Sequence, residues 1–170
     1  MKQLTVDNWL AVDPIIASGI FVRIQSAGGT VAELTADDWT ARLLDIHISP
    51  AVPDSVRDQV EIARGAMIYG SLFYPLFTLG LEQLFRVSEA AARAKAAQLG
   101  IPNDRTYYEV LADLRARNML TDSDHDAWSH IRRFRNVTTH AQDAMILAPG
   151  AAIGMFATVA AAINQLFTDS

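Results

Sequence analysis

The longest helical pattern in the chain constrains the fold most. It covers residues 54–99 and is closed by Gly100 and Pro102. Pro75 lies in its interior, where a proline removes one helical hydrogen bond and clashes with the preceding turn. We therefore expect a kink or a break between Tyr74 and Leu76.

The middle of this pattern, residues 65–81, has no charged residue, which raises the question of a membrane span. Its length is at the short end of the spanning range, about 17–25 residues, and it contains glycines, a proline and two tyrosines, so a buried core helix is favoured. A second apolar helix is predicted from Pro149 to Phe167, where Asn164 and Gln165 interrupt the apolar run. No membrane segment is expected.

Three Thr-x-x-acid sequences predict helix starts, because the threonine and the acid can each accept a hydrogen bond from a free backbone N–H of the first turn. The predicted helices run from Thr35-Ala-Asp-Asp38 to about His47, from Thr106-x-x-Glu109 to about Arg117, and from Thr121-Asp-Ser-Asp124 into residues 128–140. Asn118 is a suitable residue to end the second of these.

The segment before residue 35 permits two interpretations. Asp13 followed by Pro14 resembles a helix start, and Gly28-Gly29 a stop, which predicts a helix over residues 14–26. The alternation of apolar and polar residues over 20–25 also permits a strand, with a hairpin through the two glycines.

Together these signals predict an all-α fold, a bundle of about six or seven helices. At 170 residues the chain is expected to be a single domain, residues 1–170, with residues 54–168 as its core and residues 1–50 as an N-terminal extension. No internal repeat or linker divides it.

Composition excludes several classes of function. The chain has 51% hydrophobic residues and no cysteine, so disulfides and cysteine metal sites are absent. The first residues lack the apolar stretch of a signal peptide, and a cytoplasmic protein is expected. A net charge of -5 argues against a general nucleic-acid coat but leaves room for a local basic site.

Motifs for other chemistries are missing from the sequence. It contains no phosphate-binding glycine loop, no dinucleotide-binding turn and no serine-hydrolase elbow. His125 and His130 are five residues apart, so they do not share a helical face as a zinc pair would. We expect neither a metal nor a cofactor.

The stretch 128–140 concentrates the polar chemistry of the chain. The helical offsets of Trp128, Ile131 and Arg132 indicate an amphipathic helix. Within the stretch, or at its end, lie three arginines, one amide and two histidines: Arg132, Arg133, Arg135, Asn136, His130 and His140.

An arginine and a histidine at one phosphate would do complementary work. The guanidinium binds phosphate oxygens in a fork, and the imidazole moves a proton near neutral pH. Arg135 and His140 are five residues apart and so lie well round a continuous helix from each other, whereas Asn136 and His140 form an i,i+4 pair. Thr138 and Thr139 weaken the helix at this point.

The sequence Arg135-Asn136-x-x-x-His140, preceded by Ile131-Arg132 and followed by a helix of small residues, resembles the R-x(4-6)-H signature of the HEPN superfamily. The resemblance is most specific over residues 120–145 and more diffuse over 60–170. It implies a small helical bundle, many of whose relatives are metal-independent endoribonucleases or components of toxin and phage-defence systems.

The resemblance also implies roles for individual residues. Arg135 and His140 would be catalytic, Asn136, Arg132 and Arg133 would bind the substrate, and Glu82 and Glu89 would support the motif from a partner helix by pairing with Arg132 or Arg135. The implied partners are an RNA substrate, a second copy in a homodimer, and an antitoxin or other protein.

Two alternatives remain open at this stage. The arginines are also compatible with a solvated helix face or with ordinary ion pairs, and His140 with a structural role at a helix end. A non-catalytic helical module that binds RNA or a protein partner could use the same motif.

Overall fold

The computed structural model describes residues 2–18, 23–25, 31–33, 35–140 and 149–168, of which 23–25, 31–33, 135–140 and 149 are described by their backbone alone. The elements are, in chain order, α1 (Pro14–Ala17), β1 (Arg23–Gln25), β2 (Val31–Glu33), α2 (Ala36–Leu44), α3 (Asp54–Tyr69), α4 (Pro75–Gln98), α5 (Tyr107–Ala116), α6 (Asp122–His140) and α7 (Pro149–Leu166). The predicted helical bundle is confirmed, with one short hairpin beside it.

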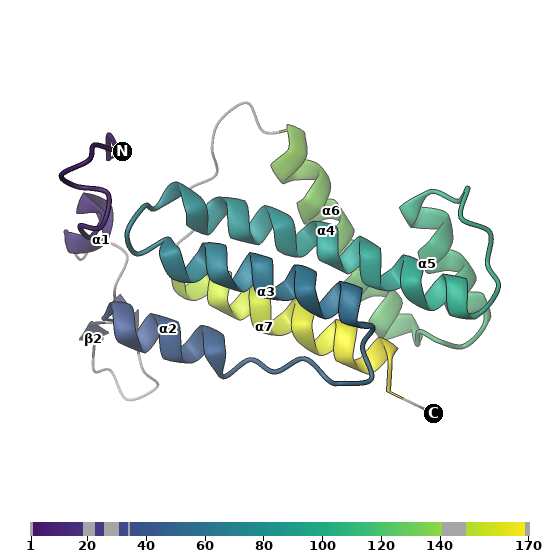
Figure 1. Ribbon diagram of the computed structural model, residues 1–170. Coiled ribbons are helices and arrows are strands. Elements are labelled where there is room, and N and C mark those ends of the chain that lie inside the picture. Colours follow the sequence, from purple (N-terminus) through teal and green to yellow (C-terminus); the bar gives the residue numbers. More distant parts are fainter. Residues whose placement is uncertain (1, 19–22, 26–30, 34, 141–148, 169–170) are drawn as a thin grey trace.

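The long pattern folds into two helices that lie side by side, α3 and α4 (Figure 1). The predicted break at Pro75 is confirmed, but the helix stops earlier, at Tyr69, and the chain reverses through residues 70–74. Pro75 occupies the first turn of α4, where its missing N–H would have no helical acceptor in any case. A single kinked helix over residues 54–99 is therefore wrong.

Gly80 allows α3 and α4 to pack closely. A Cβ atom built on it would lie 2.5 Å from the Met67 side chain and 2.7 Å from the Ala63 carbonyl oxygen. Gly154 on α7, by contrast, has nothing within 4 Å of an added Cβ. The close approach thus lies between α3 and α4.

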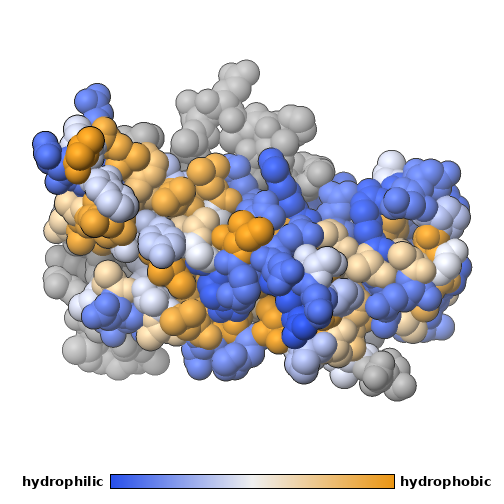
Figure 2. Space-filling model, in the orientation of Figure 1, coloured by the Kyte–Doolittle hydropathy of each residue, from blue (hydrophilic) through white to orange (hydrophobic). Residues whose placement is uncertain are grey.

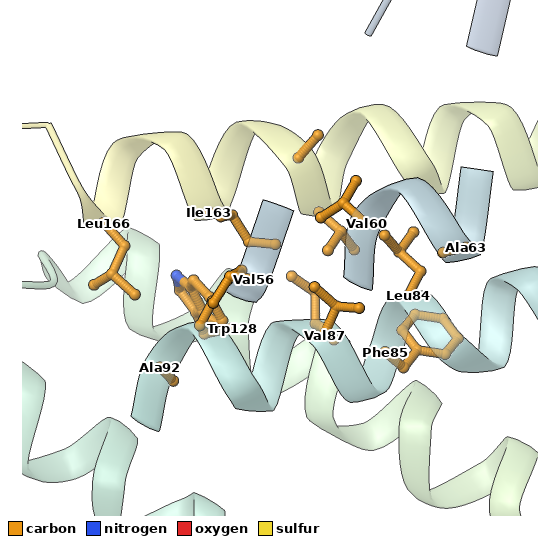
Figure 3. Packing of buried hydrophobic residues seen from close by; sticks show 14 of the residues in the cluster. Val56, Val60, Ala63, Leu84, Phe85, Val87, Ala92, Trp128, Ile163 and Leu166 are labelled. Carbon is orange, nitrogen blue, oxygen red and sulfur yellow. The ribbon is translucent and has the colours of Figure 1, made fainter. Parts of the chain in front are cut away.

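A single hydrophobic core joins α2, α3, α4, α5, α6 and α7. Figure 3 shows side chains of four of these helices directed toward one another, among them Val60, Leu84, Trp128 and Ile163. The uncharged segment 65–81 contributes Met67, Phe77 and Leu81 to this core, which confirms that it is core, although it forms the end of α3 and the start of α4 and not one helix. None of the helices in the described ranges combines the length and apolar character of a membrane span.

The capping boxes predicted at Thr35 and Thr106 are present, and the helix start predicted at Thr121 is a third box of the same kind. At each one the threonine hydroxyl accepts a hydrogen bond from the acid's backbone N–H, and the carboxylate accepts one from the threonine's N–H. The boxes at Thr35 and Thr106 begin α2 and α5, and the box at Thr121 begins α6. Asn118 has a φ of 58°, as expected of a residue that ends a helix.

The predicted helix over residues 14–26 is confirmed over Pro14–Ala17 and wrong over Arg23–Gln25, which form a strand. α1 has four residues, and β1 pairs antiparallel with β2, Arg23 opposite Glu33. In this pairing the backbone N–H and C=O groups of β1 form hydrogen bonds with β2, whereas in a helix they would bond within their own segment. The hairpin interpretation is confirmed for the strands, while Gly28-Gly29 lies outside the described residues.

Two buried charged residues attach the N-terminal segment to the turn between α3 and α4. Lys2 donates its ammonium hydrogens to the carbonyl oxygens of Ala11, at 2.5 Å, and of Leu72, at 2.9 Å. The Asp13 carboxylate accepts from the backbone N–H of Tyr74 at 3.0 Å, and burial together with the Asp13 charge raises the pKa of the Tyr74 hydroxyl. The residues between them leave several apolar side chains exposed, and Figure 2 shows hydrophobic residues gathered at this end of the molecule.

Polar side chains fix the position of α7 and α2. The Asn164 side chain accepts from the Ser49 N–H at 2.8 Å and donates to the His47 carbonyl at 2.9 Å, so the polar interruption of the last helix ties it to the loop after α2. The buried Arg64 guanidinium donates to the carbonyls of Leu43 and Ile46 and lies 5.2 Å from the Phe156 ring centroid.

Candidate functional site

Helix α6 carries the motif, and the helix continues to His140. Thr138 and Thr139 do not end it. Its first turn contains Asp122 and Asp124, whose negative charges interact favourably with the positive end of the helix dipole. Hydrogen bonds from Thr121, and a further one from Gln165 of α7, lower the pKa of the Asp124 carboxyl.

The register of α6 separates the motif residues into two stripes. Trp128 and Ile131 are buried against the core, and Arg135 lies seven residues after the first and four after the second, so its position continues their stripe. Arg132, Asn136 and His140 follow one another at four-residue steps on a second stripe. Arg135 and His140 are about 140° apart around the axis.

The structure describes Arg135, Asn136 and His140 by their backbone alone. The i,i+4 relation between Asn136 and His140 that the sequence predicts exists in the helix, since α6 is continuous between them. A hydrogen bond between the Asn136 and His140 side chains stays a prediction, because these side chains lie outside the described residues. Binding of a phosphate by Arg135 stays a prediction for the same reason.

Arg132 and Arg133 have different surroundings. Arg133 is exposed, while the Arg132 guanidinium carbon lies 5.4 Å from the ring centroid of Tyr108 on α5. The Nε–H of Arg132 is buried and has no acceptor within the described residues. Among the described side chains this guanidinium contacts a ring and no carboxylate, so an anion can bind it without first breaking an ion pair in that part of the chain.

The two glutamates on α4 are half-buried. The Glu89 carboxylate accepts hydrogen bonds from Arg93, one turn further along the same helix, at 2.8 and 3.0 Å. Arg132, for its part, contacts the Tyr108 ring on α5. The Arg135 side chain lies outside the described residues, so pairing of either glutamate with it stays a prediction.

A polar groove lies between α5 and α6, beside Arg132. Its volume is about 580 Å³, and its walls include Tyr108, Arg115, Asn118 and His125. The Tyr108 side chain is 57% exposed. The sequence analysis did not single out Tyr108, although the helical periodicity of α5 indicates its exposure. Tyr107, Val110 and Leu114 share the buried face of α5, so the position after Tyr107 lies on the outer face.

An apolar groove of about 470 Å³ lies on another side of α6, between it, α4 and α7. Phe134 is 41% exposed and its ring stacks on Phe85 at a centroid distance of 6.1 Å. His130 and Met155 also line the groove. The motif helix therefore borders a polar groove and an apolar one.

Among the described residues no group of three or more His, Cys, Asp or Glu side chains is arranged to hold a metal ion. His125 and His130 line different grooves.

In comparisons with known proteins, no protein-family model, no curated protein and no solved structure matches the chain. The functional proposal therefore rests on the motif and on the geometry of α6.

Proposed function

We propose that the protein is an endoribonuclease of HEPN type that cleaves RNA without a metal ion, in the cytoplasm. The observation that carries the proposal is the continuity of α6 through His140, which places Arg132, Asn136 and His140 on one stripe of a single helix. Rigid placement of the reacting groups is what such catalysis requires, since much of the rate gain comes from orientation.

The reaction begins when the 2′-hydroxyl of RNA attacks the adjacent phosphorus. The bond to the 5′-oxygen of the next nucleotide breaks, leaving a 2′,3′-cyclic phosphate and a 5′-hydroxyl. His140 takes or gives the proton, a contribution of roughly 10²–10⁴-fold. Arg135 stabilises the negative charge that develops on the phosphoryl oxygens. Asn136 orients the histidine or the phosphate, and Arg132 and Arg133 hold the strand.

The reaction needs two proton transfers, one from the attacking hydroxyl and one to the leaving oxygen. One histidine cannot conveniently serve both oxygens at once, so the proposal includes a homodimer in which two motifs face each other across a two-fold axis. An antitoxin or other protein partner that covers this site would explain how a cell tolerates the activity.

The test is incubation of the purified protein with total RNA in excess EDTA, followed by mapping of the cut ends. Wild type should cleave and leave cyclic phosphate, and His140→Ala should not. His130→Ala is the matched control, because His130 is an exposed histidine on the same helix. Loss of cleavage in both variants, or in neither, contradicts the assignment of His140.

A second candidate is a non-catalytic module that binds a protein partner, and the apolar groove beside α6 favours it. An exposed phenylalanine stacked over such a groove is the kind of surface that partner proteins cover. For this candidate, Arg135→Ala and His140→Ala would leave RNA unaffected, whereas Phe134→Ser would abolish partner binding or dimerisation in size-exclusion chromatography with light scattering.

A further inference from the structure

We propose that the polar groove between α5 and α6 binds an unpaired base of single-stranded RNA against Tyr108, and that the strand then runs along α6 toward the motif. This inference deepens the proposed function and rests on it for the identity of the ligand. The sequence motif by itself includes neither Tyr108 nor the groove.

Tyr108 offers the stacking surface. Its ring lines the groove and is more than half exposed, while its neighbour Tyr107 is buried in the core. An exposed aromatic ring in a groove stacks bases without regard to their identity, because every base has a π-face. The groove volume of about 580 Å³ is within the range of small-ligand sites, so a nucleobase has room to enter.

The groove walls supply hydrogen-bonding groups. Asn118 and His125 line it together with Thr121, and the side-chain amide and the imidazole are groups that can bond to base edges. Arg115, also on the wall, is tied to Asp122 by contacts of 2.8 and 2.9 Å. That ion pair neutralises an acidic residue which would otherwise repel a phosphate.

Arg132 connects the groove to the motif. Within the described residues several arginines are held in ion pairs with carboxylates: Arg57, Arg64, Arg93, Arg105 and Arg115. Among the described side chains Arg132 contacts a ring instead: its guanidinium carbon lies 5.4 Å from the Tyr108 ring centroid, and its Nε–H has no acceptor there. The remaining N–H groups of this guanidinium can bind the phosphate next to a base that stacks on the Tyr108 ring.

The geometry of α6 then sets the path of the strand. His125 in the groove, Arg132 and His140 lie on the same side of the helix, since the steps between them are seven and eight residues. From Arg132 to His140 the rise is about 12 Å. The base bound at Tyr108 thus belongs to a nucleotide a short distance along the strand from the bond that is cut.

This placement favours a single strand over a duplex. Stacking on Tyr108 needs a base that has left its own stack, and unpaired bases in loops and ends meet that condition. Figure 2 shows the α5 end of the molecule as mostly hydrophilic, in contrast to the end with the N-terminal segment.

The experiment measures binding separately from cleavage. In a His140→Ala background and in EDTA, fluorescence anisotropy follows a labelled single-stranded RNA oligonucleotide of mixed sequence. Tyr108→Leu should weaken binding about 5- to 150-fold, the range for loss of one stacked base. Tyr108→Phe should bind like the parent, because it keeps the ring. Tyr69→Leu, the control, removes a tyrosine of similar exposure, 61%, on α3 and should leave binding unchanged.

Two results overturn the inference: equal affinity of Tyr108→Leu and Tyr69→Leu for the RNA, or no RNA binding by the His140→Ala parent. The proposed function is judged separately, by the cleavage assay of the wild-type protein. Cleavage that depends on His140 together with normal binding by Tyr108→Leu removes the groove and keeps the enzyme. Tyr108-dependent binding without any cleavage by wild type keeps the groove and removes the enzyme.

Discussion

Replacing Gly80 with alanine should destabilise the protein relative to the same change at Gly65, although both glycines lie inside helices. At Gly80 the new Cβ would lie 2.5 Å from Met67 Cγ and 2.7 Å from the Ala63 carbonyl oxygen, against 3.5–4.0 Å for atoms in ordinary contact. At Gly65 it would meet nothing within 4 Å. A backbone carbonyl cannot rotate away, so α3 and α4 must separate.

The magnitude follows from two opposing contributions. Both substitutions gain about 1 kcal/mol from the higher helix propensity of alanine. Overpacking a close-packed interface costs about 1–3 kcal/mol, and only Gly80→Ala incurs this cost. The two variants should therefore differ by about 1–3 kcal/mol in free energy of unfolding, with Gly65→Ala more stable than wild type. For a chain of this length the difference corresponds to roughly 2–12 °C in Tm.

Urea denaturation followed by circular dichroism measures both free energies of unfolding in the same buffer. Equal stability of Gly80→Ala and Gly65→Ala would refute the reasoning, since it would mean that α3 and α4 do not approach each other at Gly80. Gly154→Ala, whose added Cβ also meets nothing within 4 Å, provides a second control on α7.

The remaining predictions concern charged and titrating groups. Arg64→Lys should lower the free energy of unfolding by about 1.5–3 kcal/mol, because one ammonium cannot replace the guanidinium bonds to two backbone carbonyls, while Arg57→Lys, with an exposed partner, should change it by less than about 1 kcal/mol in urea denaturation. Hydrogen bonds from Thr106 lower the pKa of Glu109, so their stabilising effect is present above its ordinary pKa of 4.5 and is lost as the pH falls through the folded pKa; Thr106→Ala should move the NMR-measured pKa back toward 4.5. The pKa of Tyr74 is raised by burial and by the Asp13 charge, so the midpoint of its ultraviolet titration should lie above the ordinary value of 10.0, with stability falling as the pH rises through the folded pKa.

Local signals predicted most of the helices. The boxes at Thr35, Thr106 and Thr121 place helix starts correctly because a capping box acts within four residues of the chain. Pro75 predicts a break for the same kind of local reason. The extent of the break could not be predicted from the sequence, since the reversal over residues 70–74 depends on how α3 packs against α4.

Structural features that depend on contacts between residues far apart in the sequence could not be predicted from local patterns. The first predicted helix failed over Arg23–Gln25 because β1 is stabilised by pairing with β2, which a local pattern does not contain. Gly80 and Gly154 look equivalent in sequence, and only the packing of α4 on α3 distinguishes them. Likewise, the periodicity of α5 exposes Tyr108, but its contact with Arg132 requires the two helices to lie together.

The claim that α6 carries an RNA-cleaving site is tested most directly with two oligonucleotides that differ in one atom. Both contain a mapped cut site, and one of them lacks the 2′-hydroxyl of the nucleotide 5′ to the broken bond. In excess EDTA, wild type should cut the all-ribose substrate, leave a 2′,3′-cyclic phosphate, and leave the deoxy-substituted substrate intact at that bond. Cutting of the deoxy-substituted substrate at the same bond would contradict the account, because the attacking group would then come from elsewhere.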